Sequence, residues 1–325
     1  MSKPKLVVAQ PSLPPETGEL LGQNYELIYT DPKNPDVLYR DLAQATGLFP
    51  AALQVDEALL SRAPLLRIAS DVGVGYNNFH IDAMRRRRVL GTNTPFVLDD
   101  AVADAIVGLM LACARRISEL DRYVKEGRWT GKEGRGLFGL EFSKKTLGII
   151  GMGRIGQAVA RRCRLGFSMN VLYHNRNPLA DSLGAAYTDM DTLLRTSDYV
   201  LVMTPLTRET ENMIGLEQFQ KMKRTAIFIN ASRGDVIREE DLIEALSHGL
   251  LYGAGIDVYQ QEPVDPANPL LRFPNVVTTP HIGSSTHETR DAMFLRAAQN
   301  MCAFAAGLTP PDVVPELLQD ANLTE

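Results

Sequence analysis

Near its middle the chain reads Thr146-Leu147-Gly148-Ile149-Ile150-Gly151-Met152-Gly153-Arg154-Ile155-Gly156. The five residues before the first glycine form a short apolar run, which is typical of a buried parallel strand. An amphipathic run then extends from Arg154 to Leu165 and predicts a helix. A strand, a glycine-rich turn and a helix in this order form the G-x-G-x-x-G element of dinucleotide-binding domains.

Each glycine of this motif has a separate physical purpose. Gly151 permits a tight turn, Gly153 lets the backbone approach a pyrophosphate, and Gly156 lets the helix pack closely on the strand. The helix N-terminus attracts the phosphate charge. We therefore predict a dinucleotide site that includes these glycines together with Arg154 and Ile155. The alternative is a structural turn, because glycines at this spacing also occur by chance.

The residues after the next expected strand favour NADP over NAD. NAD enzymes usually carry an acidic residue about 20 positions past the glycines, where it holds the ribose hydroxyls. This chain instead has Asn175-Arg176-Asn177, and its first acid afterwards is Asp181. Arg176 can pair with a 2′-phosphate and Asn175 can donate a hydrogen bond to it. We expect NADP as the preferred cofactor and NAD as a poorer one; a surface arginine in an NAD enzyme is the alternative.

Short apolar runs alternate with helical or polar stretches on both sides of this element. Upstream, strands are expected at residues 6–9, 25–29, 65–70 and 89–93, and they indicate parallel strands joined by crossover helices. Downstream, strands are expected at 171–174, 199–204, 226–230, 253–258 and 276–279, with helices at 191–195, 216–222 and 239–247. This rhythm predicts an α/β fold with an open, doubly wound parallel sheet.

Two longer helices bear on how the domains are divided. An apolar helix is expected from Asp99 or Asp100 to Ile117, and its apolar density suggests burial between domains or between subunits. A final helix is expected over residues 286–306 and should return to the first domain. A chain of 325 residues is also too long for one ordinary core, which again predicts two domains.

Charge and hydrophobicity exclude some classes of partner. A formal net charge of −5 gives no electrostatic basis for general binding to nucleic acid or to an anionic membrane. The longest apolar run, residues 101–114, is too short to span a bilayer, and no secretory segment precedes the first strand. We therefore expect a cytoplasmic protein without nucleic-acid or membrane partners.

Two local features carry weaker signals. Cys113, Cys163 and Cys302 lie far apart and none has the spacing of a metal site, so we expect buried small hydrophobic residues and no metal. The run Arg85-Arg86-Arg87-Arg88 follows a possible short helix over residues 80–84. It is interpreted as a solvated helix end, with a site for a phosphorylated or acidic substrate as the alternative.

Three residues beyond the glycine motif are candidates for chemistry. Arg233, Glu262 and His281 each follow the C-terminal end of a predicted strand. Open α/β sheets bind ligands at this edge, so the three side chains could converge on one cleft. Taken singly, each also has an ordinary explanation as a loop charge, a turn residue before proline and a core histidine.

Five motifs occur in order along most of the chain: Val72-Gly73-Val74-Gly75-Tyr76-Asn77-Asn78, the glycine motif, Asn230-Ala231-Ser232-Arg233-Gly234-Asp235, the segment from Asp257 to Pro263, and Pro280-His281-Ile282-Gly283-Ser284. Together they resemble the D-isomer-specific 2-hydroxyacid dehydrogenase family. Leu206-Thr207-Arg208-Glu209-Thr210 and the pair Asn175-Arg176 make the chain most similar to bacterial glyoxylate/hydroxypyruvate reductases that also act as 2-ketoaldonate reductases, of the 2-ketogluconate reductase type.

This resemblance implies a particular domain arrangement. A Rossmann cofactor domain over residues 100–286 would be inserted into a flavodoxin-like substrate domain made of residues 1–99 and 287–325. It also implies a homodimer built largely through the cofactor domain. Trp129 and the loop over residues 131–139 fit a dimer arm, with an ordinary surface loop as the alternative.

The resemblance also implies roles for single residues. The catalytic set would be Arg233, Glu262 and His281. The substrate would be bound by Val74, Gly75, Arg233, His281 and Ser284. Besides the glycine motif and the pair 175–176, cofactor contacts would come from Thr204, Pro205, Ala231, Arg233, Asp257, His281 and Gly283, with Asp257 near the nicotinamide carboxamide.

The residue types suit reduction of a 2-oxo acid to a D-2-hydroxy acid. This reaction needs a fixed cation for the carboxylate, a proton donor for the carbonyl oxygen and a hydride donor. Arg233 can bind the carboxylate and polarise the keto oxygen. His281 is the natural acid, because imidazole exchanges protons near neutral pH, and Glu262 on its other ring nitrogen would stabilise imidazolium.

Three other functions stay open from the sequence. Some relatives keep the fold and serve as dinucleotide-sensing regulators or corepressors, so a binding protein is one alternative. The arginine run over residues 85–88 could select a phosphorylated 2-ketoaldonate. The enzyme could also work in the NAD-linked, oxidative direction.

Overall fold

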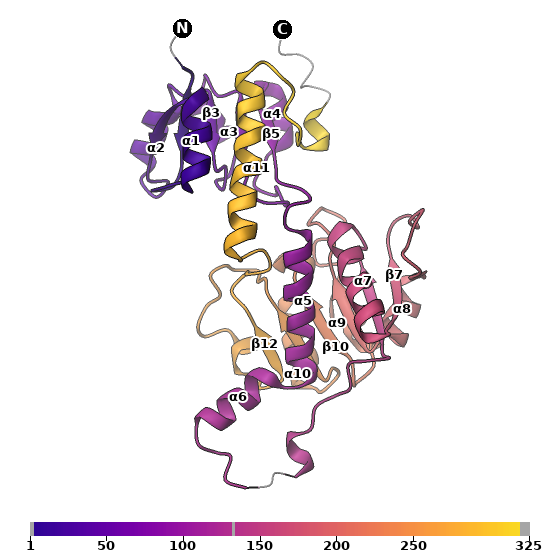
Figure 1. The fold of residues 1–325 in the computed structure, drawn as a ribbon. Helices are drawn as coiled ribbons and strands as arrows, with labels where there is room; N and C mark the ends of the chain where they lie inside the picture. The colour runs from indigo at the N-terminus through magenta and orange to yellow at the C-terminus, as the bar shows by residue number, and fades with distance from the viewer. Residues whose placement is uncertain (1–2, 132–133, 319–325) are drawn as a thin grey trace. The chain divides into compact units, whose positions relative to one another are not determined.

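The computed structural model describes residues 3–131 and 134–318, and their contacts divide the chain into two compact units (Figure 1). Unit 1 consists of the described residues up to Leu98 together with those from Thr286 onward. Unit 2 runs from Asp99 to Ser285 and is therefore inserted into unit 1.

Unit 1 contains a five-stranded parallel sheet in the order β2-β1-β3-β4-β5. Its strands are β1 (Lys5–Val8), β2 (Glu26–Tyr29), β3 (Gly47–Phe49), β4 (Ile68–Ser70) and β5 (Leu90–Thr92). Every pair of neighbouring strands is parallel. This strand order is that of flavodoxin-like sheets, as the sequence predicts.

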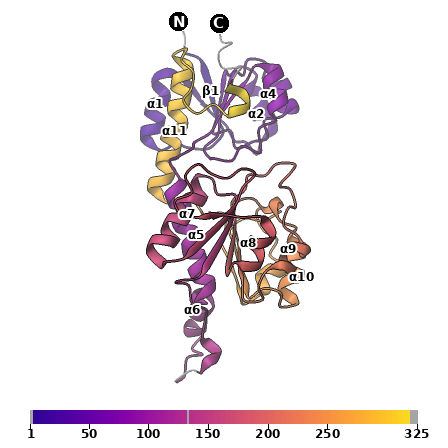
Figure 2. The same ribbon diagram turned by 90° about the vertical axis from the view of Figure 1, so that its right-hand side faces the viewer.

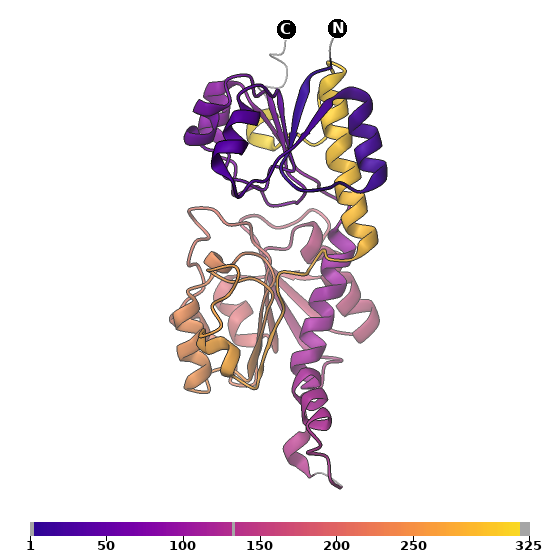
Figure 3. The ribbon, with the colours of Figure 1, turned by 90° about the vertical axis from the view of Figure 1, so that its left-hand side faces the viewer.

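Among the described residues of unit 1, five helices cover this sheet, and the last of them comes from the far end of the chain. They are α1 (Pro15–Asn24), α2 (Pro35–Leu42), α3 (Glu57–Arg62), α4 (Ile81–Arg87) and α11 (His287–Ala305). Figure 3 shows α11 lying beside α1, against which it packs. Ala297, Ala298 and Met301 of α11 are fully buried in the same core as Leu6 and Phe49. The C-terminal helix thus completes the hydrophobic core of unit 1.

Unit 2 contains a seven-stranded parallel sheet in the order β12-β11-β10-β9-β6-β7-β8. Its strands are β6 (Thr146–Ile150), β7 (Asn170–His174), β8 (Ala186–Tyr187), β9 (Tyr199–Val202), β10 (Ile227–Asn230), β11 (Gly253–Ile256) and β12 (Val276–Thr278). Apart from the extra strand β12, this is the dinucleotide-binding order, and the direction of winding reverses between β6 and β9. The glycine motif directly follows β6, at that reversal.

Helices cover both faces of this sheet, as Figure 2 shows. One face carries α5 (Asp99–Ala114) and α7 (Arg154–Phe167), and the other carries α8 (Met190–Thr196), α9 (Leu216–Lys221) and α10 (Glu239–Ser247). The other helical elements within the described part of unit 2 are α6 (Ile117–Lys125) and three short 3-10 turns at Arg135–Leu137, Gly234–Val236 and Pro269–Arg272. The predicted fold class, two doubly wound parallel sheets with a Rossmann unit inserted into a flavodoxin-like one, is confirmed.

Two predicted helix boundaries are wrong. The apolar helix does not reach Ile117, because α5 ends at Ala114 and Arg116 adopts a left-handed φ of 56° before α6 begins. Its packing on α7 and on β10, β11 and β12 within unit 2 accounts for the burial that suggested a position between domains or subunits. The helix expected over residues 80–84 extends to Arg87, because cations near a helix C-terminus are favourable.

Several elements were not anticipated individually, and one cysteine differs from expectation. Strands β3 and β8 have only three and two residues, too few to show a period in the sequence. Cys113 and Cys163 are buried, and burial raises the pKa of both thiols to about 12. Cys302 is only partly buried, because it lies at the edge of the α11–α1 contact, where Asn24 Nδ2 is 3.3 Å from its sulfur.

Within the described part of the chain, none of the helices is long and apolar enough to cross a membrane.

Candidate active site

Three neighbouring strands of unit 2 end together and present the candidate catalytic residues at one edge of the sheet. Asn230, the last residue of β10, is in register with Ile256, and Ile256 is in register with Thr278 of β12. Arg233 and His281 each lie three residues past these ends, and Glu262 follows on the loop after β11. Carboxyl ends of parallel strands meet at the same edge, so the three loops emerge side by side.

Hydrogen bonds and close packing join these three loops. Asp257 N donates to Asn230 O at 3.0 Å, and His281 N donates to Asp257 O at 2.9 Å. A Cβ atom on Gly234 would lie 2.0 Å from the backbone of Tyr259, so the Arg233 loop lies directly on the loop that leads to Glu262. Only glycine fits between these two backbones.

His281 and Glu262 form a hydrogen-bonded pair. His281 Nδ1 lies 2.8 Å from Glu262 Oε2, and Glu262 Oε1 accepts a hydrogen bond from Tyr259 N at 3.0 Å. The carboxylate is thereby held from both sides, and it orients the imidazole ring. The pair is partly solvent-accessible, with side chains 48% and 37% exposed. Within residues 3–131 and 134–318, nothing else bonds the ring, so Nε2 is available to a ligand.

The turn that carries His281 is organised by Asp257. His281 itself has a left-handed φ of 53°, a conformation that is costly for a residue with a side chain. Asp257, only 5% exposed, accepts from Thr279 Oγ1 at 2.6 Å, from Ile282 N at 2.9 Å and from Gly283 N at 3.0 Å. Both carboxylate oxygens of Asp257 are therefore engaged in holding the turn; its expected contact with a carboxamide stays a prediction.

Arg233 lies on a loop that is tied back to its strand. Asn230, which is fully buried, donates from Nδ2 to Arg233 O at 3.0 Å, and its Oδ1 accepts from Ser232 N at 3.1 Å. The guanidinium Nη1 donates to Ser232 O at 2.7 Å, and the residue is half-buried. The 3-10 turn from Gly234 begins immediately after it. The backbone that supports the cation is thus defined by internal hydrogen bonds.

The glycine motif has the surroundings that a bound dinucleotide requires. Gly151 has a φ of 92°, and a Cβ there would lie 2.8 Å from the carbonyl of Met203. A Cβ on Gly156 would lie 3.0 Å from Gly151 O, so this glycine allows helix α7 to pack closely. Gly153 differs from both, because a Cβ there would meet nothing within 4 Å, so no described protein atom blocks the approach of a phosphate from that side.

A buried hydroxyl beside this motif also fits a bound cofactor. Thr204 Oγ1 is buried and lacks a hydrogen-bond partner within the described part of the chain. A Cβ on Gly151 would lie 2.8 Å from Thr204 Cγ2, so the two residues are adjacent. An unpaired buried hydroxyl is costly unless a ligand or water completes it.

Other candidate cofactor residues are held by the protein itself. Asn175 Oδ1 accepts from Met152 N at 2.7 Å, so this amide supports the glycine loop. Arg176 is exposed. The hydrogen bond from Thr207 is the main cause that lowers the pKa of Glu209, and the charge of Arg176 lowers it further. Arg154 Nε pairs with Asp99 Oδ2 at 3.1 Å.

The remaining candidates lie on loops beside these groups or in unit 1. Pro205 O accepts from Thr210 Oγ1 at 2.6 Å, which closes the loop after β9. Ala231 and Ser284 are half-buried neighbours of the Arg233 and His281 loops. In unit 1, the N–H groups of Val74 and Gly75 have no acceptor among the residues that the structure describes.

In the arginine run over residues 85–88, the side chains of Arg85, Arg86 and Arg87 form ion pairs or hydrogen bonds within unit 1. Arg85 pairs with Asp82 at 3.3 Å and donates to Glu316 O at 2.6 Å. Arg86 and Arg87 both pair with Glu57. These pairs support the interpretation as a solvated helix end. They weigh against a phosphate site there.

Sequence reasoning missed the residues that hold the loops. Asn230 bonds Arg233 and Tyr259 bonds Glu262, each within one loop, whereas Thr279 joins the loop of His281 to Asp257. The available signal was a polar residue at the end of an apolar strand, since Asn230 follows Ile227-Phe228-Ile229. Such a residue is buried only when its amide is satisfied.

Comparison with known proteins identifies the family. The model of the D-isomer specific 2-hydroxyacid dehydrogenase NAD-binding domain matches residues 107–283. The chain is 44% identical over 324 residues to glyoxylate/hydroxypyruvate reductase B of Serratia proteamaculans, covering 98% of this chain and 99% of that protein. This chain belongs to the D-isomer-specific 2-hydroxyacid dehydrogenase family. The predicted family is therefore confirmed.

Solved structures of similar proteins agree with the fold. The NADPH-dependent glyoxylate/hydroxypyruvate reductase of Sinorhizobium meliloti, in complex with NADP and malonate, has a TM-score of 0.89 and 30% identity, covering 97% of this chain and 98% of that chain. The TT0316 protein of Thermus thermophilus has a TM-score of 0.88 and 38% identity, covering 95% of this chain and 99% of that chain. The chain is accordingly an NAD(P)-dependent dehydrogenase of the 2-hydroxyacid family.

Proposed function

We propose that this dehydrogenase reduces glyoxylate, hydroxypyruvate and 2-oxo acids of the 2-ketogluconate type to D-2-hydroxy acids, with NADPH as the preferred cofactor. The observation that carries the proposal is the 2.8 Å hydrogen bond between His281 Nδ1 and Glu262 Oε2, beside the loop that carries Arg233. A proton donor, its partner and a cation then lie on three adjoining loops. These are the groups that carbonyl reduction of an anionic substrate needs.

Arg233 would anchor the substrate. Its planar guanidinium binds a carboxylate through two parallel hydrogen bonds and can also polarise the neighbouring keto oxygen. The backbone of the loop is held by Asn230 and the guanidinium donates to Ser232 O, so both are restrained before a ligand binds. In unit 1, the N–H groups of Val74 and Gly75 would be donors for a substrate carboxylate.

His281 would deliver the proton to the carbonyl oxygen from Nε2. As the ring is held at Nδ1 by Glu262, the carboxylate stabilises imidazolium before transfer and keeps the ring orientated. Glu262 therefore acts through His281. In the reverse direction neutral His281 would accept the proton at Nε2.

The glycine loop, Thr204 and Arg176 would hold the cofactor, which supplies the hydride when it is bound. Arg176 is the exposed cation after β7, and Asn175 supports the glycine loop through Met152. Replacement of Arg176 by alanine should raise the KM for NADPH by about tenfold or more and leave that for NADH nearly unchanged, since one charge-assisted phosphate contact is lost. Equal effects on the two cofactors would remove the argument for NADP.

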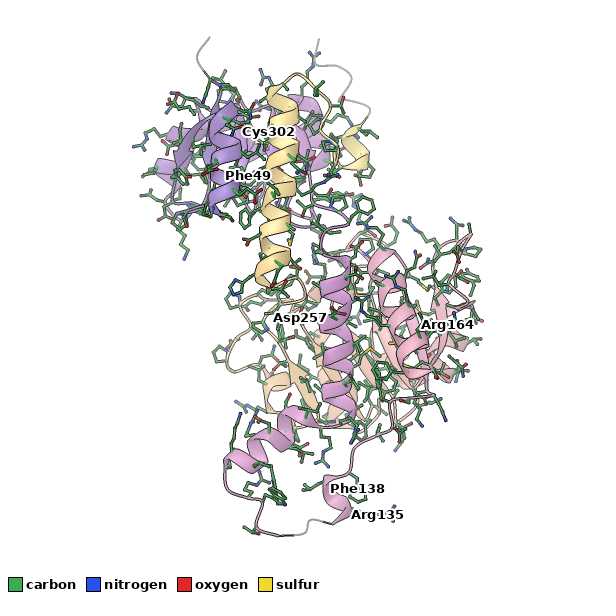
Figure 4. All side chains as sticks on the ribbon, viewed as in Figure 1. Phe49, Arg135, Phe138, Arg164, Asp257 and Cys302 are labelled. Atoms are coloured by element: carbon green, nitrogen blue, oxygen red, sulfur yellow. The ribbon has the colours of Figure 1, made fainter. Side chains whose placement is uncertain are left out.

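We further propose a homodimer formed through unit 2. Helix α6 and the segment after it expose apolar side chains that no described residue covers, among them Trp129 at 64% and Phe138 at 65%. Figure 4 labels Phe138 on this segment. Part of the predicted arm, residues 132–133, lies outside the described residues. Light scattering of the wild type and of a Trp129→Lys variant tests the association; a monomeric wild type would refute it.

The decisive test of function is a panel of 2-oxo acids assayed with both nicotinamides. Oxidation of NADPH should depend on glyoxylate, hydroxypyruvate or 2-ketogluconate, and NADH should support lower kcat/KM. Chiral analysis of the product should give the D-hydroxy acid from hydroxypyruvate. Absence of turnover with every acid in the panel would refute the proposal.

A further inference from the structure

In unit 1, the peptide planes of the loop from Val72 to Tyr76 are orientated by hydrogen bonds that come from one side of the loop. Thr94 N donates to Gly73 O and Asn93 Nδ2 donates to Val74 O, each at 2.8 Å. A trans peptide is planar, and its C=O points opposite to the N–H of the next residue. The N–H groups of Val74 and Gly75 therefore point away from the Asn93–Thr94 segment. They have no acceptor among the described residues.

Asn93 is itself held by the C-terminal part of the chain. Its N–H donates to Asp312 O at 3.2 Å, and its carbonyl accepts from Asn300 Nδ2 at 3.1 Å. Asn300, fully buried on α11, also accepts at Oδ1 from Asp312 N at 3.1 Å. Asn93 and two C-terminal residues more than 200 positions further along the chain thus share one buried hydrogen-bond network. A buried hydrogen-bond network of this kind specifies geometry more sharply than apolar packing.

The segment that follows α11 is anchored independently of Asn93. Arg296 of α11 forms two hydrogen bonds with the Asp312 carboxylate, from Nε at 2.6 Å and from the terminal nitrogen Nη2 at 2.8 Å. The Asp312 side chain is only 3% exposed and that of Arg296 is 32% exposed, so the carboxylate of this bidentate pair is shielded from water. Val313 then pairs with Thr92 in an antiparallel bridge, beside β5.

The same segment also reaches the far end of the loop. Tyr76 OH lies 3.1 Å from Glu316 Oε2, and partial burial, together with this carboxylate, raises the pKa of Tyr76 to about 12. Arg85 donates to Glu316 O at 2.6 Å and so holds the residue from the other side. The loop is therefore held at Val74 through Asn93, and at Tyr76 through Glu316.

We propose that Asn93 and the C-terminal segment Asp312–Glu316 are positioning residues for the substrate carboxylate. They set the direction of the Val74 and Gly75 N–H groups, and Asn300 transmits the position of α11 to Asn93. This inference rests on the proposed function, in which those two N–H groups bind the carboxylate. Affinity for the 2-oxo acid then depends on a C-terminal segment that lies more than 200 residues from Asn93 in sequence.

The test compares Asn93→Ala with a matched control, Asn24→Ala. Asn24 is a partly buried amide in the same unit that donates to Leu20 O and to Cys302 Sγ of α11, and it has no hydrogen bond to the loop. We expect Asn93→Ala to raise the KM for glyoxylate and the inhibition constant of oxamate by about tenfold, the value of one lost orienting hydrogen bond. The KM for NADPH should stay within about twofold. Asn24→Ala should change neither constant.

A second variant covers the case in which Asn93→Ala does not fold. Tyr76→Phe removes one partly exposed hydroxyl and leaves the core intact, so it should fold and raise the KM for glyoxylate by about threefold. Equal KM values in wild type and in the folded variants would overturn the inference while leaving the function standing. An equal rise in the KM for NADPH, or an equal effect of Asn24→Ala, would show general destabilisation and also overturn it. An inactive wild type would refute the function itself.

Discussion

Replacing Glu262 by glutamine tests the proposed acid-base pair most directly. Both carboxylate oxygens of Glu262 are used, one by Tyr259 N at 3.0 Å and one by His281 Nδ1 at 2.8 Å. A glutamine has only one oxygen, so keeping the bond from Tyr259 turns its NH₂ group toward Nδ1. The ring can then accept that bond only in its neutral form, and imidazolium loses its partner.

The expected fall in kcat follows from the loss of one charge-assisted hydrogen bond. Bonds of this type contribute about 1.5–3 kcal/mol, which corresponds to roughly 10- to 150-fold in rate. Solvent screening favours the lower part of this range, because the side chains of His281 and Glu262 are 48% and 37% exposed. We expect kcat for glyoxylate reduction to fall by about ten- to thirtyfold.

The assay is steady-state kinetics with NADPH and saturating glyoxylate, accompanied by thermal unfolding. The control is Glu240→Gln, which replaces an exposed carboxylate on α10 and should leave kcat unchanged. The KM for NADPH should stay within about twofold in both variants. A kcat for Glu262→Gln within about twofold of wild type would refute the role of the pair. A similar loss in Glu240→Gln would show a non-specific charge effect.

Three further variants test single structural claims. Asp257→Asn leaves one side-chain oxygen for three donors, so urea unfolding should show a free energy of unfolding about 2 kcal/mol lower, together with a lower kcat. An unchanged free energy of unfolding would contradict the role of Asp257 in the turn. Gly153→Ala should raise the KM for NADPH by about tenfold without loss of stability, since its Cβ meets nothing in the protein; an unchanged KM would place the pyrophosphate elsewhere. Gly234→Ala should lower the free energy of unfolding by more than about 2 kcal/mol, because the added Cβ overlaps the Tyr259 backbone. The control Gly166→Ala in helix α7 should raise the free energy of unfolding by about 0.5–1 kcal/mol. Equal unfolding curves for the two variants would refute the packing argument.

The elements of unit 2 could be predicted more fully than those of unit 1. Strands such as Tyr199–Val202 and Ile227–Asn230 are uninterrupted apolar runs between helical patterns, so their type is evident without any partner. In unit 1, β3 has three residues, and its neighbours β1 and β4 are needed to make it a strand. Short strands are defined by pairing, which a local pattern does not contain.

In the candidate site too, some features could be predicted from the sequence and others could not. Arg233, Glu262 and His281 could be selected from the sequence, because each follows a strand end and matches a family motif. Their geometry could not, because it depends on Asp257, Asn230 and other groups that bond backbone atoms of another loop. The amide of Asn175 also supports the glycine loop through Met152, which local chemistry does not reveal.

By itself, the sequence determined which chemistry is available to this protein. Glycine spacing, strand ends and residue types are local properties, and they specify a parallel α/β fold, a dinucleotide motif and a cation, an imidazole and a carboxylate. Only the tertiary structure decided how these groups are held: which oxygen of Glu262 meets His281, how Asp257 supports a left-handed turn, and how Asn300 and Asp312 reach Asn93. Such contacts join segments far apart along the chain, so they exist only once both cores have packed.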